Sequence, residues 1–110
     1  MVGADVIIGE YVILYCLGPV TIHARSMISQ YSHLCAGTHD YTRADLPLIR
    51  LPIVIEEDVW IAADVFVGPG VTVGRGSVLG ARASAFRDLP PWKVCVGNPA
   101  VPVKDREFQQ

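Results

Sequence analysis

The sequence predicts an all-β fold, a parallel β-helix of about four coils, and three observations support this. Branched aliphatic residues return at every sixth position through most of the chain. The fifth position of each six is mostly small or β-branched, and the second is often glycine, which suits a bend with positive φ or a close backbone approach. A period of six fits neither a helix nor a simple strand alternation, but it is typical of a solenoid of short strands and bends.

The repeat is clearest from Ile55 to Ser84, where five sixes follow one another without interruption. All eleven first positions of the frame are Val, Ile or Leu, whereas only 32 of the 110 residues are, so chance does not explain the frame. These positions are Val2, Ile8, Leu14, Ile22, Ile28, Leu34, Ile55, Ile61, Val67, Val73 and Leu79. With three sixes to a coil and first residues inward, the stacked columns are Ile22, Ile55 and Val73; Ile28, Ile61 and Leu79; and Leu34 with Val67.

One domain is predicted, because 110 residues do not supply two cores. Its β-helix covers residues 1–84, with an excursion loop at 40–54 inserted, and residues 85–110 form a C-terminal cap. The excursion lacks the six-residue frame, and fifteen residues outside a compact repeat are long enough to suggest a function. In the cap, turn signals bracket a short strand at 94–96, which we expect to fold back over the last coil and shield its edge.

Composition and charge argue against several classes of function. The net charge is −2 with no basic run, which disfavours a nucleic-acid or acidic-membrane surface. No apolar run approaches the length of a membrane span, and the repeat starts directly after Met1, so we expect no signal peptide. The three cysteines are odd in number and lack metal-ligand spacing, as expected of reduced thiols in a cytoplasmic protein.

The hydrophobic content predicts an oligomer. Hydrophobic residues make up 51% of the chain, more than the eleven inward positions can absorb. A short chain with a thin core buries little surface by itself. The surplus therefore indicates a subunit interface.

His39 is the residue whose position suggests chemistry. It ends the second coil, immediately before the excursion, where a rigid coil would fix it at the root of a loop. A neutral imidazole near pH 7 can take a proton from a hydroxyl group, so His39 is a candidate general base, although a histidine in a turn can also simply cap a backbone group. Asp40 is a candidate to orient the imidazole, but the side chains of adjacent residues rarely point together.

Three further residues are candidates for ligand binding. Trp60 should lie on the outer surface beside Met27, where a tryptophan either belongs to an interface or lines a ligand slot. Arg87 and Lys104 belong to a late group of basic residues, which are either solvated or bind a phosphate-rich ligand. The three histidines do not all share one repeat position, so no metal site is predicted.

Four stretches of the chain resemble a known family. They read LGPVTI, ISQYSHLCAGTHDY, PIVIEEDVWIAADVFVGPGVTVG and DLPPWKVCVGNPAVPVK. Through them the chain resembles the hexapeptide-repeat, left-handed β-helix acyltransferases, and most closely their colanic-acid-type exopolysaccharide acetyltransferase branch. The resemblance implies a left-handed helix, a homotrimer, acetyl-CoA as acyl donor in a groove between subunits, and a saccharide hydroxyl as acceptor.

The resemblance also assigns roles on the acceptor side. His39 matches the family's catalytic histidine, which deprotonates the acceptor. Tyr41 is a candidate wall of the acceptor pocket, and Trp60 matches a tryptophan at the acceptor and thioester end of the tunnel. Relatives in this branch usually carry asparagine where Cys16 stands, so the acceptor side differs here.

On the donor side, the resemblance assigns four residues to CoA. Ala63 and Ala81 match coil positions whose backbone groups hydrogen-bond the pantetheine arm. Arg87 stands where relatives usually have lysine, and Lys104 matches a basic residue near the nucleotide phosphates. Val101 replaces a frequent basic residue, so one phosphate contact is expected to be missing.

The sequence therefore predicts a cytoplasmic O-acetyltransferase with an N-terminally shortened helix, because family members carry further coils ahead of Met1. The open first coil would allow trimers to pair. Two alternatives remain at this point. One is a shortened module that trimerises and binds CoA without catalysis, and the other is a metal-dependent hydratase of related fold.

Overall fold

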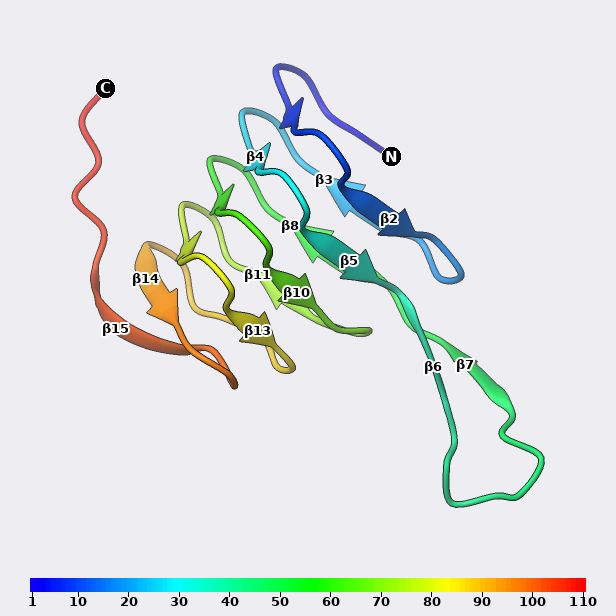
Figure 1. Ribbon diagram of the computed structural model, residues 1–110. Helices are drawn as coiled ribbons and strands as arrows, with labels where there is room; N and C mark the ends of the chain where they lie inside the picture. The colour runs from blue at the N-terminus through cyan, green and yellow to red at the C-terminus, as the bar shows by residue number, and fades with distance from the viewer.

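The computed structural model describes residues 1–110 as an elongated stack of coils, 50 × 28 × 20 Å in extent, built from short strands without any helix. Figure 1 shows the coils following one another from the blue N-terminal end to the orange C-terminal end, with one green hairpin projecting from the stack. The all-β prediction is confirmed.

Three sheets form the faces of the stack, and strands from successive coils pair within them in parallel. The six-stranded sheet contains, in order, β1 (Ile7–Ile8), β4 (Met27–Ile28), β9 (Trp60–Ile61), β12 (Val78–Leu79), β14 (Lys93–Val96) and β15 (Val101–Asp105). The four-stranded sheet contains β13 (Ser84–Ala85), β10 (Phe66–Val67), β5 (His33–Cys35) and β2 (Ile13–Tyr15). The three-stranded sheet contains β11 (Thr72–Val73), β8 (Ile53–Ile55) and β3 (Val20–Ile22). Within these sheets only β15 is antiparallel to its neighbour, β14.

The predicted stacking columns are confirmed by the strand registers. The paired residues, each one coil apart, are Ile22 with Ile55 and Ile55 with Val73, Ile28 with Ile61 and Ile61 with Leu79, and Leu34 with Val67. The first coil joins the same columns through the pairs Val2 with Ile22, Ile8 with Ile28, and Leu14 with Leu34.

Burial follows from this stacking. From Ile22 to Leu79, every first-position residue of the frame is at most 1% exposed. Val2 and Ile8 are 51% and 40% exposed, because one side of the first coil is uncovered. Since burying a Val, Leu or Ile side chain stabilises a fold by roughly 1.5–3 kcal/mol, the columns form the core.

The fifth positions line the corners of the coils, and Ser32 shows how a polar residue is accommodated there. Its buried Oγ donates to the carbonyl of Ala62 at 2.8 Å and accepts from the Val65 N–H at 3.1 Å, both in the next coil. Ser26 makes the same two kinds of hydrogen bond with its own neighbouring coil. The hydroxyl therefore satisfies backbone groups that the turn leaves without partners.

The glycines at second positions allow close approach and do not supply positive φ. A Cβ on Gly74 would lie 2.6 Å from the backbone nitrogen of Pro91, and one on Gly9 would lie 2.8 Å from that of Gln30. Positive φ occurs instead at other glycines and at corner residues such as Arg82. Of the two reasons that the sequence offered for these glycines, contact between coils is the correct one.

The excursion is a β-hairpin, and its bounds differ from the predicted 40–54. β6 (Gly37–His39) pairs antiparallel with β7 (Leu48–Arg50), and β8 has already resumed the coil at Ile53. Thr38, expected at a fifth position inside the coil, is exposed in β6. The strand pairing was missed because it follows no six-residue period, yet the backbone groups of an excursion need partners and antiparallel pairing supplies them.

The coil wall is continuous across the base of this hairpin. The carbonyl of Ala36 accepts hydrogen bonds from the Gly18 N–H at 3.0 Å and from the Leu51 N–H at 3.2 Å. The Ile53 N–H then donates to the carbonyl of Pro19 at 2.9 Å. The chain therefore rejoins the stack beside the point where it left.

The stack continues beyond Ser84, where the frame was expected to end. The columns are extended by the pairs Ala85 with Val67, Leu89 with Val73, and Cys95 with Leu79. Leu89 follows Ala85 by four positions and not six, and this shorter step hid the continuation. The strand expected at 94–96 belongs to β14 and continues the coil, whereas β15 is the strand that folds back over it.

Candidate functional site

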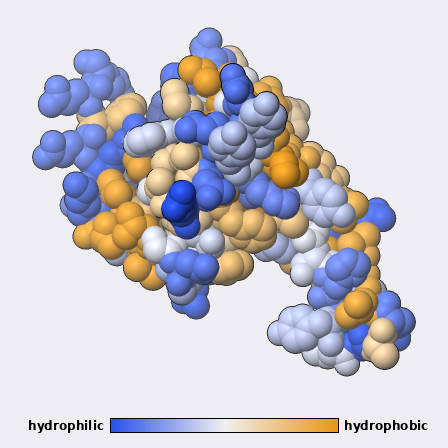
Figure 2. All heavy atoms as spheres, in the orientation of Figure 1, coloured by the Kyte–Doolittle hydropathy of each residue, from blue (hydrophilic) through white to orange (hydrophobic).

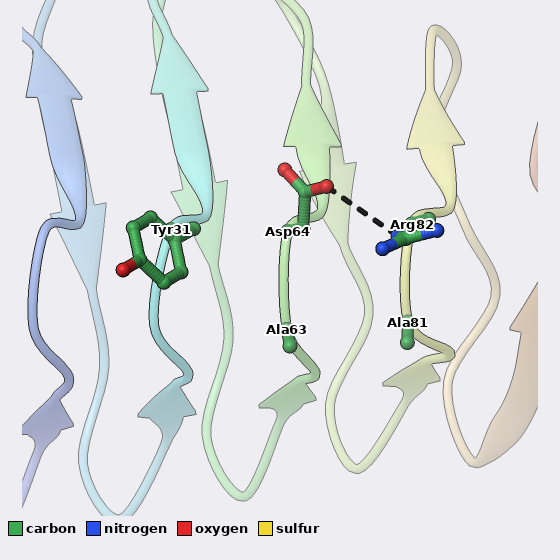
Figure 3. A pocket seen from close by; sticks show the side chains of 5 residues that line it. All are labelled: Tyr31, Ala63, Asp64, Ala81 and Arg82. Carbon is green, nitrogen blue, oxygen red and sulfur yellow. Dashed lines mark ion pairs between the residues drawn. The ribbon is translucent and has the colours of Figure 1, made fainter.

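An open groove runs along the corner between the six-stranded and the four-stranded sheets. It has a volume of about 640 Å³ and is lined by Tyr31, Ala63, Asp64, Ala81 and Arg82. Figure 3 shows these side chains on successive coils, with Ala63 and Ala81 next to each other. The structure therefore brings together the two alanines that the sequence assigned to the donor side.

The repeat itself shapes the groove. Ala63 and Ala81 hold the third position of their sixes, and Asp64 and Arg82 hold the fourth, with φ of 56° and 63°. The Arg82 N–H donates to the carbonyl of Ala63 at 2.9 Å, and the exposed side chains of Asp64 and Arg82 lie 3.6 Å apart as an ion pair. A methyl-lined floor beside a polar wall suits an extended, flexible ligand.

Sequence reasoning did not place three lining residues in this groove, namely Tyr31, Asp64 and Arg82, although Arg82 belongs to the late group of basic residues considered for a phosphate-rich ligand. All three hold the fourth position of their sixes. In two of the three cases this position directly follows one of the alanines. The shared position was therefore the sequence signal that could have placed these residues in the groove.

His39 is held at one ring nitrogen by the hairpin loop. It is the last residue of β6 and is exposed, and its Nδ1 lies 2.8 Å from the carbonyl oxygen of Leu46. Because a carbonyl oxygen only accepts hydrogen bonds, Nδ1 carries the proton in this contact. In the neutral ring Nε2 then has a free lone pair, which is the state that a general base requires.

Asp40 does not orient the imidazole directly. Its Oδ1 accepts hydrogen bonds from the Thr42 N–H at 3.0 Å and from the Thr42 hydroxyl at 2.5 Å. These bonds, the hydroxyl first, lower the pKa of Asp40. The sequence offered Asp40 only as a candidate for that contact, with the objection that adjacent side chains rarely point together, and here the carboxylate bonds to Thr42 and not to His39. Tyr41 follows in the loop and is 87% exposed.

Trp60 lies on a different face from His39. It is in β9 of the six-stranded sheet, partly exposed beside Met27 as predicted, and its Nε1 donates to Ser29 Oγ at 3.0 Å. His39 belongs to the hairpin, which leaves the stack after β5 of the four-stranded sheet. Accordingly, no cavity of a single chain is lined by both residues.

Lys104 and Arg87 are free cations near the C-terminal end of the stack. Lys104, in β15, lines a cavity of about 520 Å³ together with Trp60 and Val94. Arg87 is exposed and lies outside this cavity. Neither side chain has an ion-pair partner in the chain, so each is available to a negatively charged ligand.

A second group of charges at another corner is structural. The nearly buried carboxylate of Asp58 accepts two hydrogen bonds from Arg25, at 2.8 and 3.2 Å, and lies 3.6 Å from Arg75. The hydrogen bond from Arg25 is the main cause that lowers the pKa of Asp58, against the opposing effect of burial. Arg106 binds two backbone carbonyls at the same corner. These charged groups bond to one another or to the backbone, which leaves them little hydrogen-bonding capacity for a ligand.

A row of aromatic rings crosses the four-stranded sheet. Tyr15, His33, Phe66 and Phe86 stand on successive coils, with ring centroids 6.3, 5.5 and 5.9 Å apart. Tyr15 and Phe86 are about half exposed. Figure 2 shows orange hydrophobic residues at several places on the outer surface, including the hairpin. These exposed apolar side chains belong to the surplus of hydrophobic residues from which the sequence predicts a subunit interface.

The chain brings together no group of three His, Cys, Asp or Glu side chains that could hold a metal ion. His33 lies in β5, His39 in β6, and His23 follows β3. None of its elements is a helix of the length and apolarity that crossing a membrane would need.

The sequence matches a known repeat family. Residues 52–84 match the family described as bacterial transferase hexapeptide (six repeats). "Putative colanic acid biosynthesis acetyltransferase WcaF" of Escherichia coli is 52% identical over 99 residues, which make up 90% of this chain and 54% of that protein. "Putative acetyltransferase C18B11.09c" of Schizosaccharomyces pombe is 41% identical over 91 residues, 80% of this chain and 44% of that protein. The chain thus spans about half the length of the curated relatives it matches.

Solved structures of acetyltransferases share the fold. A maltose O-acetyltransferase from Clostridium difficile superposes with a TM-score of 0.92 at 28% identity, over 97% of this chain and 59% of that one. The hexapeptide-repeat acetyltransferase VCA0836 of Vibrio cholerae, complexed with acetyl-CoA, gives 0.91 at 32% identity, over 97% and 60%. A galactoside acetyltransferase in complex with CoA gives 0.82 at 27% identity, over 96% and 60%.

Residues 52–84 therefore carry the hexapeptide repeat, and most of the chain is similar to proteins named as acetyltransferases. Its relatives include the colanic acid biosynthesis protein WcaF, so the resemblance found in the sequence is confirmed. The family and the structural neighbours imply that its β-helix is left-handed, an exception to the usual right-handed crossover.

Proposed function

We propose that the chain is an acetyl-CoA-dependent O-acetyltransferase that acts on a saccharide hydroxyl, with His39 as general base. The observation that carries the proposal is the 2.8 Å contact between His39 Nδ1 and the Leu46 carbonyl, which leaves Nε2 with a lone pair on an exposed ring. The names of similar proteins support the acceptor class, since they include a maltose and a galactoside acetyltransferase.

The transfer needs one base and no covalent enzyme intermediate. Nε2 of His39 takes the proton of the hydroxyl as its oxygen attacks the thioester carbon, and such a base contributes about 10²–10⁴ in rate. The new C–O bond forms, the C–S bond breaks, and the imidazolium returns the proton to the leaving thiolate. His39 hydrogen-bonds a carbonyl and no serine or cysteine, so an activated nucleophile of the kind used in covalent catalysis is not indicated.

The corner groove suits the donor. Ala63 and Ala81 present only methyl groups, which leaves space for the long pantetheine arm of CoA along the coils. Lys104 and Arg87, free of ion pairs, would bind the phosphates, because charge-assisted hydrogen bonds to phosphate are strong. Bound acetyl-CoA would supply the activated acetyl group.

The working form in this proposal is a homotrimer in the cytoplasm. His39 and Trp60 stand on different faces of one chain, so a pocket that contains both needs His39 from one subunit and Trp60 from the next. The exposed apolar side chains of the stack would pack in such an interface. Tyr41, exposed beside His39, would then contribute to the acceptor wall.

The deciding experiment replaces the base. His39→Ala should lower thiol release from acetyl-CoA at least about 100-fold across a panel of saccharides, since general-base catalysis is lost. Acetyl-CoA affinity by calorimetry and the molecular mass in solution should stay unchanged. His23→Ala, which alters a histidine of the coil wall, is the matched control and should remain active. Unchanged turnover in His39→Ala would overturn the mechanism.

A second candidate function is a CoA-binding, trimerising module without catalysis. Ala63 and Ala81 lie together in one chain, whereas the chain spans 54% of its E. coli relative and does not join His39 to Trp60 by itself. Tight binding of acetyl-CoA with no thiol release from the unaltered protein, for any saccharide tested, would favour this candidate.

A further inference from the structure

Leu46 reaches His39 because its backbone adopts an unusual conformation. Its φ is +47°, in the left-handed region that residues other than glycine seldom adopt. Pro47 follows, and a residue before proline is disfavoured in the right-handed helical region. Such a conformation is strained and persists only where the surrounding structure holds it. The position of the Leu46 carbonyl therefore depends on the rest of the loop between β6 and β7.

The hydrogen bonds that hold this loop begin at Asp40. Its carboxylate accepts from the N–H and the hydroxyl of Thr42, at 3.0 and 2.5 Å, which fixes the first turn. The Arg43 N–H lies 3.4 Å from the carbonyl of Asp40, and the Leu46 N–H donates to the carbonyl of Arg43 at 3.1 Å in a second turn. The Asp40 N–H donates to the carbonyl of Pro47 at 2.9 Å, which closes the loop behind Leu46.

A second carboxylate of the loop makes different contacts. Asp45 pairs with Arg43 at 3.1 and 3.3 Å, and both side chains are more than 60% exposed. An exposed pair of this kind contributes little to order. Asp45 and Asp40 therefore form a matched pair of acidic residues in one loop, of which only Asp40 bonds to the backbone.

We propose that Asp40 is a positioning residue for acetyl transfer. Through its turn with Thr42 it sets the Leu46 carbonyl against His39 Nδ1, and it thereby keeps the lone pair of the neutral ring on Nε2. This inference rests on the proposed role of His39 as general base. Without the carboxylate, the loop relaxes at Leu46, the carbonyl leaves Nδ1, and both tautomers of the ring become populated. A ring that carries its proton on Nε2 cannot accept the hydroxyl proton there.

The test compares Asp40→Ala, Asp40→Asn and Asp45→Ala in the full chain. Nitrogen-15 NMR of the imidazole reports the tautomer of His39 in the absence of substrate, at a pH where the ring is neutral. We expect the Nδ1–H form in the unaltered protein and a mixture in Asp40→Ala, with kcat lowered about 10- to 100-fold and KM for acetyl-CoA unchanged. Asp40→Asn keeps an acceptor oxygen for Thr42 and should restore both readouts. Asp45→Ala should leave both unchanged.

The outcomes separate this inference from the proposed function. If His39 of Asp40→Ala keeps its proton on Nδ1, the proposal is overturned, whatever the activity. If the tautomer changes while acetyl transfer persists, the structural link from Asp40 is supported and the catalytic role of His39 fails. Thermal unfolding shows whether Asp40→Ala is folded. Thr42→Val, which removes only the hydroxyl donor, provides a second variant, and an unchanged tautomer there as well would overturn the link.

Discussion

The guanidinium Nη1 of Arg106 donates a hydrogen bond to the backbone carbonyl of Asp58 at 2.6 Å, although 48 positions separate the two residues. The same nitrogen donates to the carbonyl of Gly76, one coil further on, at 3.0 Å. The guanidinium also lies over the ring of Phe108, 4.5 Å from its centroid. In Figure 1 the C-terminal segment accordingly runs back past successive coils of the stack. Arg106 fastens this segment across two coils at one corner.

Removing this fastening should destabilise the stack. Hydrogen bonds from a charged donor contribute about 1.5–3 kcal/mol, so Arg106→Ala should lower the free energy of unfolding in urea by about that much. Arg106→Lys keeps the charge but lacks the planar guanidinium group that reaches two carbonyls. Its free energy of unfolding should therefore lie between those of the unaltered protein and Arg106→Ala. Arg87→Ala, at an exposed cation without an ion pair, is the control. A loss in Arg106→Ala no larger than in this control would show that the fastening contributes nothing.

Asp58 should make the stability depend on pH at the acid end. Because the hydrogen bond from Arg25 lowers its pKa, the unfolded state, with a carboxyl pKa of about 3.9, binds the proton more tightly than the folded state. The contribution is therefore complete well above about pH 4 and is lost as the pH falls through the lower folded value. Urea unfolding of the unaltered protein and Asp58→Asn should differ by about 1 kcal/mol at neutral pH, and the gap should close on acidification. A gap independent of pH would contradict this assignment.

A larger side chain at the groove floor should block the donor. Ala81→Leu fills the slot between Ala81 and Ala63, so the affinity for acetyl-CoA measured by calorimetry should fall at least about tenfold, or 1.4 kcal/mol. The free energy of unfolding should change little, because Ala81 is exposed. Ala44→Leu makes the same change at an exposed site of the hairpin loop and should bind acetyl-CoA normally. Equal affinities in the two variants would show that acetyl-CoA binds outside this groove.

The core could be predicted from the sequence because one spacing determines it. Ile22, Ile55 and Val73 stack as the six-residue frame requires, since each coil repeats the previous one. Where the spacing changes, prediction fails, and the four-residue step before Leu89 concealed the last part of the stack. A period in the sequence reports only residues that face a common axis.

Within the candidate site, the resemblance to the family assigned Ala63 and Ala81 to the donor, and the six-residue spacing accounts for their proximity. Ala63 and Ala81 hold equivalent positions in neighbouring coils, so the repeat places them together. The contact between His39 and Leu46 follows no period, because a left-handed backbone at Leu46 and the turn at Asp40 create it. Turns of this kind depend on side-chain hydrogen bonds within the loop, which residue spacing does not reveal.

The hydrogen bond from the Leu51 N–H to the Ala36 carbonyl closes the wall of the stack behind the hairpin. Because of this closure, the contacts between the adjoining coils do not depend on the length or sequence of the segment between β6 and β7. Natural variation can therefore lengthen, shorten or replace this segment of the hairpin at little cost to folding. Such changes would alter which molecules the hairpin contacts. A scaffold with this property separates the evolution of selectivity from the evolution of stability.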